Sequence, residues 1–257
     1  MSTLTVYQTT DAQADGSSGW DGPWSTAWGT GQACTANLSY MYAPEIYYGY
    51  DDSGGDPAYY YRTIIRRGLL TFDTTSIDSS AIISSATLSL KASGTSYYGW
   101  PGGTVPAAGI YSASPANKTS LDGTAANFNC LGTTKLSDTT KTAAQWTTNS
   151  TPNDFAFNST GLSNITKAGY SCFGIREANF DATNTQPTTG VTSYDFYVSL
   201  FGYGQNNLPL YGHSLTVTYT TPVGPVNAKT FKGLAAASVK TVNGVAIASV
   251  KTKNGVS

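Results

Sequence analysis

The sequence predicts an all-β fold: an antiparallel β-sandwich or jelly roll followed by a short C-terminal tail of β-repeats. Segments in which apolar and polar residues alternate recur along the chain, and this is the pattern of half-buried strands. Turn residues separate the segments, and no strand-helix-strand succession typical of a parallel sheet is visible. Only 11% of the 257 residues are charged, against about 25% in ordinary soluble domains. Ser, Thr, Gly, Asn and Tyr take their place, which suits strands with hydroxyl-rich exposed faces.

The first half of the chain contains three predicted strands around one region without a clear pattern. Residues 4–8 (LTVYQ) form the first strand, and residues 66–72 (RRGLLTF) form the second. Residues 82–90 alternate apolar positions with Ser and Thr and are followed by Lys91, so one face of this strand is expected to be buried. Residues 11–62 are rich in Gly and Tyr and have only weak periodicity.

The second half adds five strands and one short helix. We expect the helix over residues 161–169, with Ser163 as a possible N-cap and Gly169 just past its end. Alternation is clearest near the end of this half. The predicted strands are residues 109–111, 154–157, 171–176, 194–200 and 215–219.

The chain divides into three parts. Residues 1–221 form the jelly-roll body, and residues 222–228 form a linker that begins Pro222-Val-Gly-Pro225. Residues 229–257 form a repeat tail, because the pairs Lys229-Thr230, Lys240-Thr241 and Lys251-Thr252 lie 11 residues apart. One short repeat cannot bury its own apolar face, so it needs neighbours to stack on. The tail therefore predicts assembly or anchoring rather than catalysis.

Each tail repeat is expected to form a strand, a turn and a second strand. Asn243-Gly244 and Asn254-Gly255 are strong signals for two-residue turns. The expected strands pair between chains or add to a partner's sheet. The residues assigned to this role are Lys229, Lys240, Asn243, Gly244, Val245, Ile247, Val250 and Lys251.

Charge separates the tail from the body. From Pro222 onward the chain has five lysines and no acidic residue, which leaves 9 basic and 15 acidic residues before Pro222. The body therefore carries a formal charge of −6 and the tail +5, within a total of −1. A basic arm can bind an acidic surface, including the body of a neighbouring copy. The alternative is that the lysines protect exposed strand edges from aggregation.

The sequence does not predict an enzyme. A Ser-His-Asp arrangement would have to use His213, the only histidine, and no nucleophile elbow is present. Glu177 follows a predicted strand and is the main candidate for carboxylate chemistry. The spacing of Cys34, Cys130 and Cys172 matches no zinc pattern, and it allows three thiols or one disulfide with one thiol.

Two groups of loop residues are candidates for binding. Asp51, Asp52 and Asp56 could supply oxygen ligands to Ca²⁺, although a solvated Gly-rich loop is the favoured explanation. Aromatic residues crowd into the same region and can form a glycan platform, a protein interface or a structural cover. The aromatic candidates are Tyr47, Tyr48, Tyr50, Tyr59, Tyr60, Tyr61 and Trp100.

Residues 67–90 (RGLLTFDTTSIDSSAIISSATLSL) resemble the signature of DNRLRE-type jelly-roll domains. That signature reads R-x-L-L-x-F-D, then I-x-x-x-A-x-I-x-S-A-x-L-x-L. Weaker similarity extends the resemblance to roughly residues 3–221, and it is carried by residues 154–158, 161–165, 173–176 and 215–219. The resemblance implies a carbohydrate-binding module or a non-catalytic domain of a surface protein. The tail resembles the C-terminal ends of phage structural proteins.

Together these features predict a non-enzymatic virion protein on the particle surface, such as a bacteriophage head decoration, head fibre or tail appendage. It would form a homo-oligomer, with a trimer as one possibility, and contact other virion proteins. The alternatives are a module that binds host polysaccharide and a subunit of an extracellular filament or surface layer. Nucleic acid is not an expected partner, because the body is acidic and the tail lysines do not alternate with aromatic residues, Phe231 being the one aromatic residue among them. Neither a secretory signal nor a membrane-spanning stretch is visible.

Overall fold

A computed structural model describes most of the body and four short pieces of the tail. The described residues are 1–20, 27, 31–51, 60–99, 104–119, 121, 126–187, 194–204, 207–222, 230–231, 234–235, 241–242 and 245–246.

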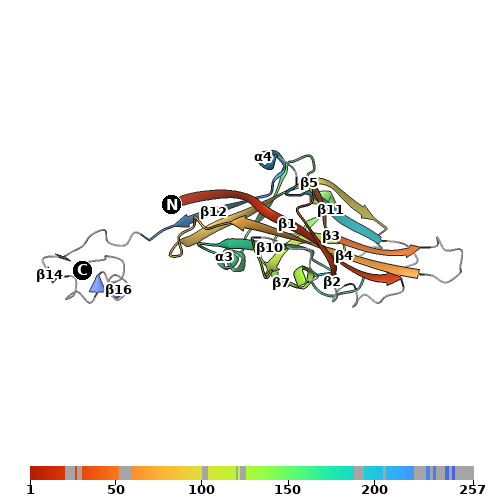
Figure 1. Cartoon of the computed structure of the whole chain (residues 1–257), viewed down its shortest axis with the longest axis horizontal. Coiled ribbons are helices and arrows are strands. Elements are labelled where there is room, and N and C mark those ends of the chain that lie inside the picture. The colour runs from red at the N-terminus through yellow and green to blue at the C-terminus, as the bar shows by residue number, and fades with distance from the viewer. Residues whose placement is uncertain are drawn as a thin grey trace.

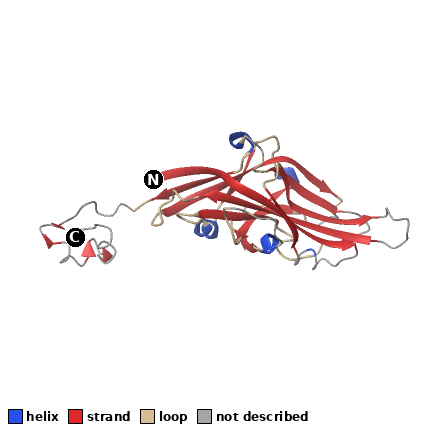
Figure 2. Cartoon of the chain, viewed as in Figure 1, coloured by secondary structure: helices blue, strands red, loops and turns tan. Residues whose placement is uncertain are grey.

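The described part of the body is built mainly of strands, which confirms the predicted all-β class (Figure 2). Three short α-helices and one 3-10 helix connect them: α2 (Ala126–Asn129), η1 (Ala143–Gln145), α3 (Ser159–Asn164) and α4 (Leu208–Tyr211). The strands are β1 (Ser2–Trp20), β2 (Gly31–Ala36), β3 (Tyr40–Asp51), β4 (Tyr60–Asp73), β5 (Ile82–Tyr98), β6 (Ala107–Ala113), β7 (Leu131–Lys135), β8 (Lys141–Thr142), β9 (Pro152–Ala156), β10 (Tyr170–Glu177), β11 (Tyr194–Phe201) and β12 (Ser214–Thr220).

Six antiparallel strands close into a barrel. Their hydrogen bonds run β1-β12-β5-β11-β3-β4 and return from β4 to β1. The strands β10, β6 and β7 continue from β4, while β2 pairs with β1, β9 with β5 and β8 with β6. The antiparallel pairing agrees with the prediction, whereas the finer assignment to a jelly roll stays a prediction.

Burial explains why some strands are visible in the sequence. In β5, Ala86, Leu88 and Leu90 are buried and alternate with half-buried Thr and Ser residues. In β12, Leu215 and Val217 are buried in the same way. Each strand places one row of side chains in the core, and this produces the period of two.

The longest strands exceed their predicted lengths. The first strand was expected over residues 4–8, but β1 extends to Trp20, and β3 lies inside the region that lacks periodicity. In β1, the residues from Thr10 to Ala14 are all buried, and several of them are polar. Because the inward and outward positions are both covered here, the alternation on which the prediction depends disappears.

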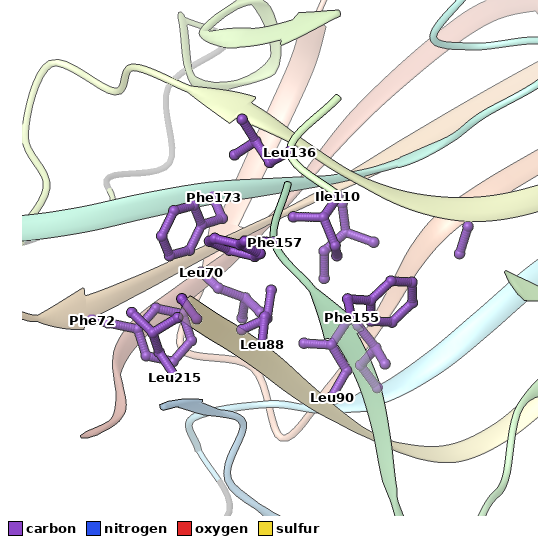
Figure 3. Packing of buried hydrophobic residues seen from close by; sticks show 14 of the residues in the cluster. Leu70, Phe72, Leu88, Leu90, Ile110, Leu136, Phe155, Phe157, Phe173 and Leu215 are labelled. Carbon is purple, nitrogen blue, oxygen red and sulfur yellow. The ribbon is translucent and has the colours of Figure 1, made fainter. Parts of the chain in front are cut away.

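The hydrophobic core forms two clusters. The larger one joins barrel strands to β9 and β10, and it includes Leu88, Phe155 and Phe173 (Figure 3). The Phe157 and Phe173 rings meet edge to face, with their centroids 5.0 Å apart. The smaller cluster lies around α2 and includes Phe128 and Leu131.

The predicted helix over residues 161–169 is shifted and shorter. It is α3, and its N-cap is Asn158, whose side-chain oxygen accepts a hydrogen bond from the backbone N–H of Gly161. Ser163 lies inside the helix and donates to the carbonyl of Ser159. The prediction was wrong about the cap because α3 has a single apolar residue, four positions after Asn158, so no apolar periodicity marks where the helix begins.

Strand register gives the barrel two distinct ends. At one end, Ser2 of β1 lies opposite Tyr219 of β12, so both strands meet where the chain leaves toward its tail. At the other end, Trp20 pairs with Arg62 and Asp51 pairs with Tyr60. Figure 1 shows the N-terminus and the end of β12 together, with the paired ends of β3 and β4 on the opposite side. We call these the terminal end and the far end.

Candidate functional site

The described tail residues form two hairpins of identical pattern. In one, β13 (Thr230–Phe231) pairs with β14 (Leu234–Ala235), and in the other, β15 (Thr241–Val242) pairs with β16 (Val245–Ala246). Thr230 lies opposite Ala235, and Thr241 lies opposite Ala246. Every strand and every partner is displaced by 11 residues from one hairpin to the next. The two short strands expected in each of these repeats are thus present and paired.

The hairpins locate part of the predicted assembly set. Val245 begins β16, and two positions separate β15 from β16, as expected for a two-residue turn at Asn243-Gly244. The remaining members lie outside the described residues: Lys229, Lys240, Asn243, Gly244, Ile247, Val250 and Lys251.

The far end of the barrel brings most of the predicted aromatic residues together. Tyr47, Tyr48 and Tyr50 lie in β3 next to the segment of β4 that contains Tyr60 and Tyr61. The strand ends of β5 and β11 join them, because Tyr48 pairs with Tyr194 and Asp195 pairs with Tyr98. Two predicted members, Tyr59 and Trp100, lie outside the described residues.

Some of these side chains reach solvent. Tyr98 is 69% exposed and Tyr97 is 46% exposed, while Tyr47 is half-buried. Asp195 of β11 lies opposite Tyr47 of β3 on one side and opposite Tyr98 of β5 on the other. Burial raises the pKa of its carboxyl group. The far end therefore combines partly exposed aromatic rings with a carboxyl group.

A second aromatic set lies along the outside of β3 and β11. The Tyr42 and Tyr197 rings meet edge to face with centroids 5.4 Å apart, and Phe201 lies 4.6 Å from Tyr211. The aromatic candidates from the sequence did not include Tyr197, Phe201 and Tyr211. The alternation in residues 194–200 could have identified Tyr197, because it points this side chain away from the face on which Phe196 and Val198 are buried.

The predicted calcium site stays a prediction. Asp51 ends β3 opposite Tyr60, whereas Asp52 and Asp56 lie outside the described residues. Within the part of the chain that the structure describes, no three His, Cys, Asp or Glu side chains come together to hold a metal ion.

Glu177 is buried, and backbone N–H groups hydrogen-bond to its carboxylate. Its carboxylate accepts hydrogen bonds from the N–H groups of Ala107, Asn179, Phe180 and Asp181. Burial raises the pKa of Glu177 to about 7, and these N–H groups oppose the rise. The carboxylate thus fixes the turn after β10 to the start of β6.

His213 is also fully buried. Its Nδ1 accepts a hydrogen bond from the backbone N–H of Lys91 at 3.1 Å, and its backbone N–H donates to the side-chain oxygen of Gln8 at 3.2 Å. Burial, together with the charge of Lys91, lowers the pKa of His213 to about 3. The neutral imidazole therefore binds β5, while the backbone of the same residue binds β1 just before β12 begins.

A buried ion network ties the turn after β10 to the sheet. Asp181 accepts hydrogen bonds from Arg67 of β4 at 2.7 Å and from Arg176 of β10 at 2.8 Å. Burial works to raise the pKa of Asp181, but the two guanidinium groups hold it below its usual range. The guanidinium of Arg67 also stacks over the Phe128 ring at 3.7 Å, and it donates to the Phe128 carbonyl. The network thereby holds α2 against β4.

Two cysteines are thiols in the structure. Cys172 is buried in the smaller core cluster, and burial raises the pKa of its thiol to about 12. Cys130 is half-buried, and its thiol donates to the carbonyl of Asn127. The side chain of Cys34 lies outside the described set.

Among the described residues, no helix has the length and apolar character needed to cross a membrane. No protein-family model matches this chain, and no curated protein matches it either.

Proposed function

We propose that this protein is a non-enzymatic structural component of a virus particle, most simply a bacteriophage, which assembles or anchors through its C-terminal repeats. The observation that carries the proposal is the repetition of one hairpin pattern at an 11-residue interval. The assignment to a virion surface rests further on the resemblance of the tail to phage structural proteins.

The size of the hairpins supports assembly. Each described strand in the tail has two residues, and an isolated two-stranded hairpin is at best marginally stable in water. Neighbouring strands, supplied by other copies or by another virion protein, would satisfy the remaining backbone groups. The five tail lysines add a salt-sensitive attraction to acidic surfaces.

The two barrel ends support a directional role. The chain leaves the barrel at the terminal end, while the aromatic strand ends gather at the far end. A particle protein held by its tail would point its far end outward. Other virion proteins and further copies of the same chain are the proposed partners at the tail, with a trimer as one arrangement.

Light scattering of the full chain and of residues 1–221 tests the proposal. The shorter chain keeps every barrel strand, because β12 ends at Thr220. We expect a defined oligomer or a polymer for the full chain and a monomer for residues 1–221. Both chains should give the same β-sheet signal in circular dichroism, which shows that the barrel is folded in each. If the full chain is a monomer, the role of the tail would be to anchor the protein to another virion protein and not to assemble copies of this chain. An oligomer that survives truncation would contradict the proposal.

A carbohydrate-binding module is the second candidate, and the gathering of tyrosines at one end of the barrel favours it. Host surface polysaccharide is the proposed ligand. A subunit of an extracellular filament or surface layer is the third candidate, in which head-to-tail contacts would build open fibres. Retention of the protein on host polysaccharide would favour the second candidate, and a continuous rise in mass with concentration would favour the third.

A further inference from the structure

A row of aromatic rings runs along the outer face of β3 and β11. Tyr40 contacts Phe201 with ring centroids 5.8 Å apart, and Phe201 contacts Tyr211 at 4.6 Å. Farther along the same two strands, Tyr42 and Tyr197 meet edge to face at 5.4 Å. We call these five residues the aromatic row.

The exposed rings of the row are not part of the core. Met41 and Ala43 alternate with Tyr40 and Tyr42 along β3, and both are fully buried in the larger core cluster. Tyr40 and Tyr42 remain 46% and 42% exposed. Since the interior is filled by the alternating residues, packing of the barrel does not require these two rings.

The surrounding backbone holds the row in place. The N–H of Tyr42 donates to the side-chain oxygen of Gln13 at 2.7 Å, and the N–H of Tyr211 donates to the carbonyl of Asn207 at 2.8 Å. The ammonium of Lys91 binds the carbonyl of Leu210 at 2.9 Å, which fixes α4. Rings that are ordered before binding reduce the entropy cost of taking up a ligand.

Polar groups lie directly beside the rings. Glu45 pairs with Tyr197 on one side of β3 and with Arg66 on the other, and the Glu45 and Arg66 side chains form an ion pair. The hydroxyl groups of Ser93 and Ser199 share a hydrogen bond of 2.7 Å on the neighbouring strands. Cores of protein interfaces are depleted of charged residues, so this face is poorly suited to an apolar protein partner.

We propose that the aromatic row binds an uncharged, linear polysaccharide that lies along β3. The apolar faces of its sugar rings would stack on the exposed rings of Tyr40 and Tyr42, which Phe201 and Tyr197 contact from the side, while its hydroxyl groups would bond to the guanidinium of Arg66, which Glu45 holds in place. The five residue steps from Tyr40 to Glu45, which lies opposite Tyr197, span about 17 Å of strand, which accommodates several sugar units. The charges beside the rings are already paired with each other, and this favours a neutral ligand over an acidic one.

This inference deepens the carbohydrate-binding candidate and does not depend on the tail. It makes the side of the barrel the glycan site, in place of the far end. Tyr98 tests the far end separately, because it lies opposite Asp195 in β11 and not opposite a residue of the aromatic row.

Affinity electrophoresis of the full chain in native gels tests the site. The probes are a soluble neutral glucan, mannan and galactan, with polygalacturonate as the acidic comparison. We expect at least one neutral polymer to retard the protein. Tyr42→Ala and Tyr197→Ala should each weaken this retardation at least tenfold, whereas Tyr7→Ala, at an exposed tyrosine outside the row, and Tyr98→Ala should leave it unchanged.

Each other outcome overturns the inference in a recognisable way. Loss of binding in Tyr98→Ala with full binding in Tyr42→Ala would move the glycan to the far end and leave the carbohydrate-binding candidate intact. Retardation by polygalacturonate alone would exclude a neutral ligand. Absence of retardation by every polymer would remove the site and count against the carbohydrate-binding candidate as well. Circular dichroism of each variant confirms that the barrel is folded.

Discussion

Single buried groups set how the stability of this protein depends on pH. His213, Asp11 and Glu177 are all buried, and burial moves their pKa values to about 3, 6 and 7. The histidine favours the folded state at high pH because it must stay neutral. The two carboxyl groups have raised pKa values, so they favour the folded state at low pH. The opposing effects partly cancel in the whole protein, and a comparison of variants separates them.

We predict that His213→Asn makes stability less sensitive to acid. The unfolded histidine titrates near pH 6.5 and the folded one near pH 3, so its contribution is complete above about pH 6.5 and is lost as the pH falls. An Asn side-chain oxygen can take the place of Nδ1 as the acceptor for Lys91. Between pH 7 and pH 5, the wild type should lose about 2 kcal/mol relative to the variant.

Urea unfolding at the two pH values measures this difference, with Gln186→Asn, a change at an exposed amide, as the control. A constant difference between wild type and His213→Asn would show that the histidine is not held neutral.

At the scale of elements, alternation of apolar and polar residues identifies strands where one face is buried and the other is not. β5, β11 and β12 meet this condition. β11 and β12 were predicted close to their observed ranges, and the prediction for β5 covered its first half, residues 82–90 of Ile82–Tyr98. β1 and β3 carry polar or aromatic residues on both faces, so their pairing partners decide their extent. Nor could local sequence reveal the turn after β10, because Arg67 reaches Asp181 across 114 residues.

That long-range network supports a prediction about how elements are held together. Asp181→Asn would leave the guanidinium groups of Arg67 and Arg176 buried beside a neutral amide. Breaking a buried charge pair costs about 3–5 kcal/mol, so the free energy of unfolding should fall by that amount. Asp154→Asn is a matched control, because Asp154 is exposed and accepts a hydrogen bond from Ser89. Equal unfolding free energies for the two variants would show that the network contributes nothing to the attachment of α2 and the turn after β10.

At the scale of the whole molecule, the barrel depends on long-range strand pairing and the tail on local pairing. The barrel closes through long-range pairing of strands that are far apart in sequence, such as β1 with β12. The tail repeats one local hairpin, and its 11-residue period is visible in the order of its amino acids alone. Of the candidate sites, the hairpin unit could therefore be predicted, while the aromatic row required the register between β3 and β11.

The repetition predicts that assembly depends on the interval between hairpins as well as on their number. Deleting residues 240–250 removes one whole repeat and joins Val239 to Lys251, which restores the original Lys-Thr spacing. Deleting residues 236–240 removes only five residues and shortens the interval from 11 to 6. If hairpins of neighbouring copies pair in register, the first variant should keep the oligomer and dissociate at a higher protein concentration. The second should not join oligomers of the full chain, since hairpins set 6 residues apart cannot both pair at once with hairpins set 11 apart. Light scattering over a dilution series measures the first effect, and capture of the untagged full chain by each tagged variant measures the second. Equal capture by the two variants would contradict pairing in register.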